Sequence, residues 1–317
     1  MQTYFEYASL EENPRYSCVN NTMSYEEMAA RHEKHPIIGG IFIVAGIFFE
    51  ICYILSLSVI WSKEFVQMSC FKLMFCLGVV DCLCIVLSNF LSGFFYIVGF
   101  EYCMAPHMSF IMGALVNGFF NTCCMLCLFL VFNRLVDVWK PQFGEMLFKG
   151  GRTWIFVFLA VAYGIFFAII PPPCLFNADY GTVIYHPLIP GKENLEYTSI
   201  YQTVANLITG TSICLCYVLI YVIHSIRMRG VDAKSQSRVQ RKILIQAVCV
   251  CFFTFTTATI WGSLIFIPPY PFMMHLGQLS WELMHGMPAI VYLFLNKTIQ
   301  RQAFRKVSDC LKMFNLI

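Results

Sequence analysis

Seven long apolar stretches constrain the fold of this chain more than any other feature of its sequence. Each approaches or exceeds the ~20 residues that a helix needs to cross the hydrocarbon core of a bilayer. A membrane barrel would instead show strands of about ten residues with alternating polarity. The sequence therefore predicts seven membrane-spanning helices, over residues 37–61, 72–98, 108–131, 153–170, 199–224, 243–267 and 272–296.

The composition agrees with an all-α membrane protein. Of the 317 residues, 58% are hydrophobic and 12% are charged, whereas soluble domains carry about 25% charged residues. We expect one seven-transmembrane helix domain over residues 37–296, preceded by an extracellular segment, 1–36, and followed by a cytoplasmic tail, 297–317. The formal net charge of +3 gives no support to a nucleic-acid partner.

The distribution of basic residues predicts the orientation. With these seven spans, 17 of the 21 Lys and Arg residues lie on the side of the carboxyl terminus and four on the side of the amino terminus. Because basic residues concentrate in cytosolic loops, we expect the amino terminus to lie outside the cell. Residues 1–36 lack the features of a cleavable signal peptide, so the first span is expected to direct insertion itself.

Two kinds of covalent modification are predicted on the outer side. Asn20 begins an Asn-Asn-Thr glycosylation sequon. Most of the 16 cysteines lie inside apolar runs, where they act as small packing residues, but Cys18, Cys103 and Cys174 face the oxidising side. We favour a disulfide between Cys103 and Cys174, joining the top of the third span to the second outer loop. The alternative is that at least one of the two is a free thiol.

Four ionisable residues lie at membrane depth, namely Glu50, Asp81, Glu282 and His285. A charge near the bilayer centre costs at least ~2.5 to 3.5 kcal/mol, so each is a candidate functional residue. The alternative for Glu50 is a protonated, hydrogen-bonded carboxyl group without a further function. At separations of 3, 4 and 3 positions, one face of the seventh span carries His275, Gln278, Glu282 and His285. This polar face is expected to point into the bundle.

Short motifs run in chain order through nearly the whole membrane region. They include Glu50-Ile51-Cys52-Tyr53-Ile54, Lys72-Leu73-Met74-Phe75, Phe132-Asn133-Arg134, Trp139-Lys140-Pro141, Gly151-Arg152-Thr153-Trp154, His285-Gly286 and Pro288-Ala289-Ile290-Val291-Tyr292. With these motifs the chain resembles the nematode serpentine receptor class T (Srt) family. Members of that family are chemoreceptor-like seven-helix proteins that are distantly similar to rhodopsin-type receptors.

The resemblance implies a rhodopsin-like G-protein-coupled receptor architecture and a chemosensory function. It implies an unidentified small-molecule ligand, a heterotrimeric G protein at the cytosolic face, and the plasma membrane of a sensory neuron, in its cilium. Because a small ligand needs a concave site among helices, we expect the pocket among the outer halves of spans three, five, six and seven and the loop 171–198. Neither a cofactor nor catalytic activity is expected, and whether the chain forms homo- or hetero-oligomers stays open.

Four residues are candidates for coupling and switching, namely Asn133, Arg134, Pro288 and Tyr292. Rhodopsin-type receptors carry an acid where this chain has Asn133, and Tyr292 follows Pro288 by four residues rather than three. Rhodopsin-type switch mechanisms therefore do not transfer in detail. We expect Arg134 to contact the G protein or to restrain the inactive state, with Asp137 as its partner. The alternative is that Arg134 anchors the helix to lipid headgroups.

The resemblance also implies that the first, second and seventh spans are neighbours. From the ~1.5 Å rise per helical residue, Glu50, Asp81 and His285 lie about 16, 14 and 16 Å from the cytosolic ends of their spans. We predict a shared intramembrane polar layer in which His285 hydrogen-bonds to Glu50 or Asp81. Pro288, one turn below, is expected to loosen the seventh helix there.

Residues 297–314 mix apolar and basic side chains and are expected to form a short helix on membrane lipid, with Cys310 as a candidate for palmitoylation.

The alternative function is a seven-helix transporter, although no repeat relates the first and last three spans. A retinal protein would need a lysine within the seventh span, but Lys297 lies at its end. No metal site is expected, because outside the seventh span the only His at membrane depth is His224, at a cytosolic end.

Overall fold

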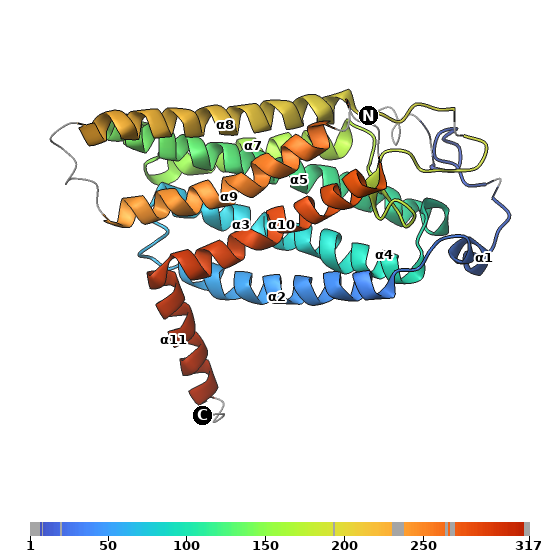
Figure 1. Ribbon diagram of the computed structural model, residues 1–317, viewed down its shortest axis with the longest axis horizontal. Helices are drawn as coiled ribbons and strands as arrows, with labels where there is room; N and C mark the ends of the chain where they lie inside the picture. The colour runs from blue at the N-terminus through green and yellow to red at the C-terminus, as the bar shows by residue number, and fades with distance from the viewer. Residues whose placement is uncertain are drawn as a thin grey trace.

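The computed structural model describes residues 7, 9–19, 21–192, 194–229, 238–263, 266 and 270–313. Its long helices lie side by side in an elongated bundle (Figure 1). The helices of the bundle are α2 (Pro36–Ile60), α3 (Ser69–Ile85), α4 (Ser92–Val98), α5 (Pro106–Trp139), α7 (Thr153–Ile169), α8 (Ile200–Arg229), α9 (Arg238–Ser263) and α10 (Pro271–Leu295). The remaining elements are α1 (Tyr25–Ala30), α6 (Pro141–Phe148), α11 (Lys297–Met313), η1 (Val86–Leu91), η2 (Tyr102–Met104), η3 (Gly150–Arg152), β1 (Leu175–Asn177) and β2 (Thr182–Ile184).

Six helices among the described residues are long and apolar enough to cross a membrane. They cover Pro36–Ile60, Ser69–Val98, Pro106–Trp139, Gly150–Ile169, Ile200–Ile223 and Leu244–Ser263, so the chain is a multi-pass membrane protein. Helix α10 has 25 residues and carries Gln278, Glu282 and His285 among its apolar side chains, and it is not one of these six helices. Its crossing of the membrane and the outward amino terminus stay predictions.

Proline sets several helix boundaries. Pro36, Pro106 and Pro271 are the first residues of α2, α5 and α10, where the missing amide hydrogen is not needed and the fixed φ suits the helix. Helix α5 continues past the predicted end at residue 131 to Trp139. It stops there because Lys140, which precedes Pro141, is held out of the helical region at φ −149° and ψ 88°.

The second predicted span is one continuous helical rod with an irregular turn. Helices α3 and α4 are joined by η1, a π-helix that keeps the same direction. Helix α4 then ends at Gly99, whose φ of 70° is left-handed and accessible to glycine without strain. Insertions of this kind are frequent near functional sites in helical proteins.

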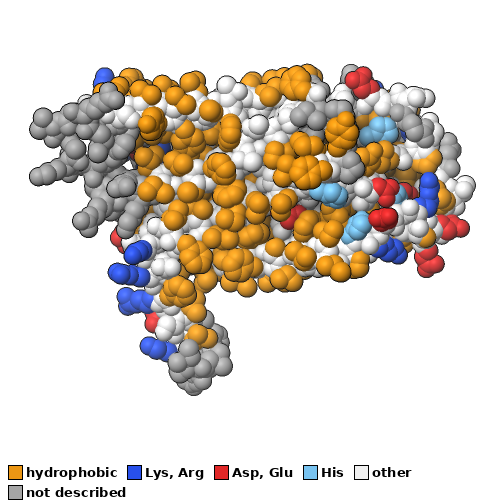
Figure 2. Space-filling view, viewed as in Figure 1, with side chains coloured by type: hydrophobic (Ala, Val, Ile, Leu, Met, Phe, Trp, Pro, Cys, Tyr) orange, Lys and Arg blue, Asp and Glu red, His pale blue; other side chains and the backbone are white. Residues whose placement is uncertain are grey.

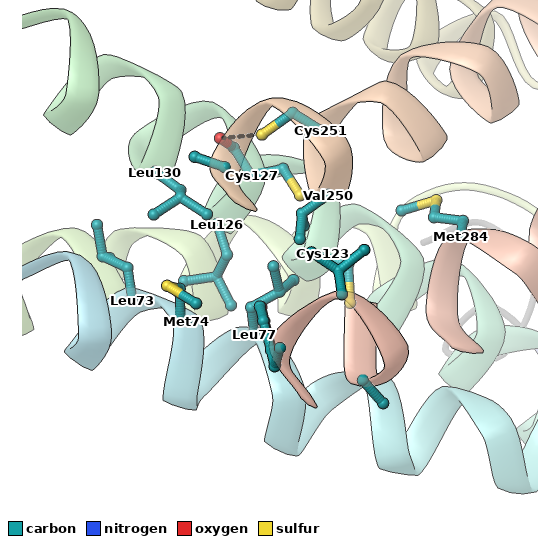
Figure 3. Close-up of a cluster of buried hydrophobic side chains, with 14 of the residues drawn as sticks. Leu73, Met74, Leu77, Cys123, Leu126, Cys127, Leu130, Val250, Cys251 and Met284 are labelled. Atoms are coloured by element: carbon teal, nitrogen blue, oxygen red, sulfur yellow. Dashed lines mark hydrogen bonds between the residues drawn. The ribbon is translucent and has the colours of Figure 1, made fainter. Parts of the chain in front are cut away.

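Helix α5 lies at the centre of the bundle, where it contacts α3, α7, α8 and α9, while α10 contacts α2, α3 and α9. The core between them is built from buried apolar side chains, and Figure 3 shows Leu, Met, Val and Cys side chains of this core. Figure 2 shows hydrophobic side chains along the flank of the bundle, Lys and Arg on α11, and Asp, Glu and His at the opposite end. This apolar flank matches the lipid contact that the predicted spans require.

A two-stranded hairpin closes one end of the bundle. Strands β1 and β2 are antiparallel, with Phe176 opposite Val183, and they contact α5 and α10 respectively. We call this end of the molecule the hairpin end and the opposite one the α11 end. The hairpin end is the one that the sequence predicts to be outside.

The disulfide at the hairpin end corrects the predicted pairing. Cys103 is bonded to Cys18 and not to Cys174, which is free. The Cys174 thiol lies 3.1 Å from Asn117 Oδ1, and Asn117 is about 16 Å along α5 from Pro106. Cys174 is therefore too deep in the bundle to reach Cys103, which precedes α5.

Hydrogen bonds fix the amino-terminal segment beside this disulfide. Tyr102 donates a hydrogen bond to the Tyr16 carbonyl over 3.0 Å, and Tyr197 donates one to the Arg15 carbonyl over 2.7 Å. Lys192 Nζ donates to the Ser17 carbonyl over 2.7 Å. Residues 15–18 therefore cover the loop between α7 and α8.

Candidate functional site

A cavity of about 560 Å³ lies below the hairpin, among α5, α8, α9 and α10. It lies among the elements where the sequence predicts the ligand pocket. It is lined by Val116, Asn117, Phe120, Cys174, Val183, Ile184, Tyr185, Glu196, Thr198, Ser199, Ile200, Gln202, Thr203, Asn206, Trp261, Met274 and Trp281. The volume falls within the range of small-molecule sites, and Glu196 is the one charged side chain of this lining.

Buried amide side chains contribute to the polar part of the cavity wall, which Asn117, Gln202 and Asn206 line. Asn121 Nδ2 of α5 donates to Gln202 Oε1 of α8 over 2.8 Å, and Gln202 Nε2 donates to Asn206 Oδ1 over 2.9 Å. Asn117 Nδ2 donates to the Pro172 carbonyl over 2.8 Å. We did not single out these residues from the sequence. The signal was present as two amide pairs spaced by four residues, which places each pair on one helical face.

Trp281 lines the cavity, and its indole N–H is a hydrogen-bond donor without an acceptor in the described part of the chain. Its side chain is 3% exposed, and its indole Nε1 has no hydrogen-bond partner among the described residues. A buried N–H without an acceptor is costly. An acceptor on a ligand in the cavity would remove that cost.

The predicted polar layer lies one helical turn below Trp281. His285 Nδ1 is 2.7 Å from Asp81 Oδ1, and both side chains are buried, so the predicted hydrogen bond to one of two carboxyl groups is confirmed with Asp81. The Tyr53 hydroxyl lies 2.8 Å from both Asp81 Oδ2 and the His285 carbonyl oxygen. The Cys123 thiol completes the environment of Asp81, at 3.3 Å from Oδ1.

Glu50 and Glu282 do not contact Asp81 in this arrangement. Glu50 is half-buried on α2 beside Cys82, and its Oε1 has no partner in the described part of the chain. The α2 residue that contacts Asp81 is instead Tyr53, one helical turn after Glu50. Glu282 accepts a hydrogen bond of 3.1 Å from Gln278. The Gln278 Oε1 in turn accepts one of 2.9 Å from Thr182 of β2, which connects α10 to the hairpin.

The polar face predicted for the seventh span is inward over most of its length. Gln278, Glu282 and His285 are buried. His275 is exposed, so the prediction is wrong for this residue. The reason is its place only one turn after Pro271, where α10 emerges at the hairpin end.

The predicted coupling residues lie on two helices. Arg134 forms an ion pair of 2.7 Å with Asp137, the partner predicted from the sequence, and it also donates to Asn133 Oδ1. Asn133 Nδ2 donates to Ser69 Oγ of α3 over 3.1 Å. Pro288 lies inside α10. Tyr292, one turn further, is fully buried and its hydroxyl has no partner among the residues described.

The tail forms the helix α11 against the end of α2. Ile299 and Ala303 are buried, and Lys306 Nζ donates to the Ser58 carbonyl over 2.6 Å. The side chain of Cys310 and the whole of Asn20 lie outside the described residues. Palmitoylation and glycosylation therefore stay predictions.

Comparison with known proteins identifies the family. The family described as "Serpentine type 7TM GPCR chemoreceptor Srt" matches residues 2–315. Serpentine receptor class T-55 of Caenorhabditis elegans is 25% identical over 226 residues, which is 71% of this chain and 61% of that protein. This match therefore spans less than two thirds of the relative's length. Because the family match covers nearly all of the sequence, the chain belongs to the Srt family of serpentine chemoreceptors.

Proposed function

We propose that this receptor binds an uncharged, largely apolar small molecule in the cavity and signals to a heterotrimeric G protein at the α11 end. The observation that carries the proposal is the cavity wall, in which an apolar lining surrounds the unused Trp281 N–H and a chain of amides. Apolar contacts supply most of the affinity in such a site, and a few polar groups select the ligand. The ligand should carry at least one hydrogen-bond acceptor.

Two helices connect the cavity with the α11 end. On α10, Trp281 lines the cavity, and its ring lies 6.3 Å from the His285 ring between centroids. On α5, Phe120 lines the cavity and Cys123 contacts Asp81. A ligand that shifts either helix changes the packing of the polar layer, so ligand and G protein would favour the same bundle arrangement.

The proposal includes the orientation and the cellular location of the receptor. The amino terminus and the hairpin end face outward at the plasma membrane of a sensory neuron, where an environmental chemical reaches the cavity. Asn20 is then available for glycosylation, and Cys310 for palmitoylation at the inner leaflet. Arg134 and Asn133, near the end of α5, contact the G protein or restrain the inactive bundle.

The experiment is a screen of the expressed receptor with neutral volatile and lipophilic compounds, read as calcium or cyclic-nucleotide signals. For an active compound, Trp281→Phe keeps the aromatic bulk and removes the N–H. We expect it to raise the half-maximal concentration about fivefold to tenfold, the loss of one neutral hydrogen bond. Trp154→Phe is the control, because Trp154 is 41% exposed on α7 and does not line the cavity. Substrate flux through reconstituted vesicles, without signalling, would support a transporter instead.

A further inference from the structure

Three metal-ligating side chains from three helices converge at the centre of the bundle. They are Cys84 of α3, Cys123 of α5 and His285 of α10, and their ligand atoms all lie within 4.8 Å of one another. Their exposed fractions are 2%, 0% and 0%. Figure 3 shows Cys123 among side chains of α3, α9 and α10, such as Leu77, Val250 and Met284. The cluster is therefore enclosed by the apolar core.

The histidine of this cluster is oriented as a metal ligand. Its Nδ1 is held by Asp81 at 2.7 Å. Its Nε2 has no hydrogen-bond partner of acceptable geometry among the described residues, although the Cys84 thiol is its neighbour. Histidines that bind metals use one ring nitrogen for the ion and give the other to a carboxylate, which fixes the ring. Asp81 therefore supplies the support that such a ligand requires.

Two thiolates and one imidazole form a ligand set that suits Zn²⁺. Tetrahedral Zn²⁺, with bonds of ~2.3 Å to sulfur and ~2.0 Å to nitrogen, holds its ligand atoms about 3.5 to 3.8 Å apart. From separations of up to 4.8 Å, the three atoms need to approach one another by at most about 1.3 Å. Two thiolates also cancel the charge of a divalent ion, and a formally neutral complex suits a core that excludes charge.

We propose that Cys84, Cys123 and His285 form a Zn²⁺ site that bridges α3, α5 and α10. On binding, the hydrated Zn²⁺ ion exchanges all but one of its water ligands for two sulfur–zinc bonds and one nitrogen–zinc bond. Each thiol releases its proton to the departing water, and no electron is transferred. The remaining water keeps the fourth position, as in other sites with three protein ligands. Asp81 gives up its contact with the Cys123 proton and keeps Tyr53 and His285 as partners. The ion stabilises one packing of three helices, including the one that carries the polar layer.

This proposal does not rest on the proposed ligand or G protein. Cysteines packed in an apolar core are ordinarily small apolar residues. The unpartnered His285 Nε2 and the supporting carboxylate distinguish this cluster from the other buried thiols. The positions of the three residues in the sequence, 84, 123 and 285, match no metal-binding spacing, because the site depends on the packing of separate helices.

The test uses the full-length receptor, purified in lipid nanodiscs through a tag without histidine, loaded with Zn²⁺ and dialysed. We expect about one zinc per receptor by mass spectrometry of the metal, and its loss in Cys84→Ser and Cys123→Ser. Cys124→Ser is the matched control, since Cys124 is the next residue on α5, is 1% exposed and lies outside the cluster. Retention in both ligand variants, or equal loss in the control, would overturn the site.

Two further measurements keep the test decisive if a variant folds poorly. Zn²⁺ should raise the unfolding temperature of the unmodified receptor and of Cys124→Ser. Loading with Co²⁺ should give the absorption band of a thiolate–cobalt bond in the same two proteins. An unmodified receptor that retains no zinc and shows no thermal shift contradicts the proposal. So does a Cys84–Cys123 disulfide in the purified protein.

Discussion

His285 of α10 and Asp81 of α3 meet at 2.7 Å in a part of the bundle that solvent does not reach. The Tyr53 hydroxyl lies at hydrogen-bond distance from both Asp81 and the His285 backbone, so three helices share one polar contact. It lies between the cavity and the predicted coupling residues, and the proposed signal passes through it.

The first prediction concerns this contact. His285→Ala leaves the Asp81 carboxyl group without its closest partner, and we expect a loss of about 1 to 3 kcal/mol in stability together with altered basal signalling. The measurement is thermal unfolding of the purified receptor, with basal signalling in cells. The double variant with Asp81→Asn should be less destabilised than the two single effects combined, because both remove the same interaction. Additive losses would show that the pair is not coupled.

The disulfide gives the second prediction. Cys18→Ser and Cys103→Ser should each reduce surface expression, because a bridge closing a long loop contributes about 2 to 4 kcal/mol. The double variant should be no worse than either single variant. Cys174→Ser serves as the comparison and should leave the Cys18–Cys103 bridge intact in a non-reducing peptide digest. Recovery of a Cys103–Cys174 peptide would contradict the observed pairing.

A histidine at the hairpin end makes stability depend on pH. His32 Nε2 lies 2.7 Å from Glu101 Oε2 and its Nδ1 2.8 Å from Asp179 Oδ2. Burial by itself lowers the pKa of His32, but the hydrogen bonds to Glu101 and Asp179 outweigh it and raise the pKa above the ordinary 6.5. A raised pKa means that this stabilisation is complete below the ordinary pKa and is lost as the pH rises through the raised one.

The third prediction is therefore a fall in unfolding temperature from mildly acidic to alkaline pH. His32→Gln should flatten that part of the profile, since glutamine carries no titrating charge. His186→Gln is the control, because no ion pair of His186 occurs among the described residues. An unchanged slope in His32→Gln would assign the pH dependence to another group.

Arg134 gives the fourth prediction. Arg134→Ala should leave ligand binding largely intact and abolish G-protein activation, because the cavity and the end of α5 are far apart along one helix. Asp137→Asn, which removes the 2.7 Å ion pair but keeps the arginine, should instead raise basal activity if the pair restrains the inactive state. Normal signalling by Arg134→Ala would reduce Arg134 to a membrane anchor.

Tags provide the fifth prediction, which concerns orientation. Tags at the amino terminus and at position 190 should be labelled on intact cells. Tags at position 235 and at the carboxyl terminus should be labelled only after permeabilisation, as the distribution of basic residues requires. Labelling at position 235 on intact cells would reverse the orientation and with it the assignment of the cavity to the outside.

The sequence predicted the features that depend on regular geometry along one helix. The spans follow from hydropathy, and the similar depths of Asp81 and His285 follow from the fixed helical rise. The choice between Asp81 and Glu50 as the partner of His285 could not be made, because it depends on the rotation of α2, which places Tyr53 rather than Glu50 at the contact.

Contacts between segments that are distant in the chain could not be predicted from the sequence. The pairing of Cys103 with Cys18 depends on how the amino-terminal segment folds back over the hairpin end. The cluster of Cys84, Cys123 and His285 depends on three helices meeting, and each residue alone looks like ordinary core packing. The same holds for the amides of the cavity, which bond across α5 and α8.

In the proposed function, occupancy of the cavity activates a G protein at the opposite end. Nucleotide exchange on a purified heterotrimeric G protein, catalysed by the receptor in nanodiscs with an active compound from the screen, measures this activation. We expect exchange that increases with compound concentration, a curve shifted to higher concentration for Trp281→Phe, and an unshifted curve for Trp154→Phe. Exchange independent of the compound, or an equal shift in both variants, would contradict the proposed function.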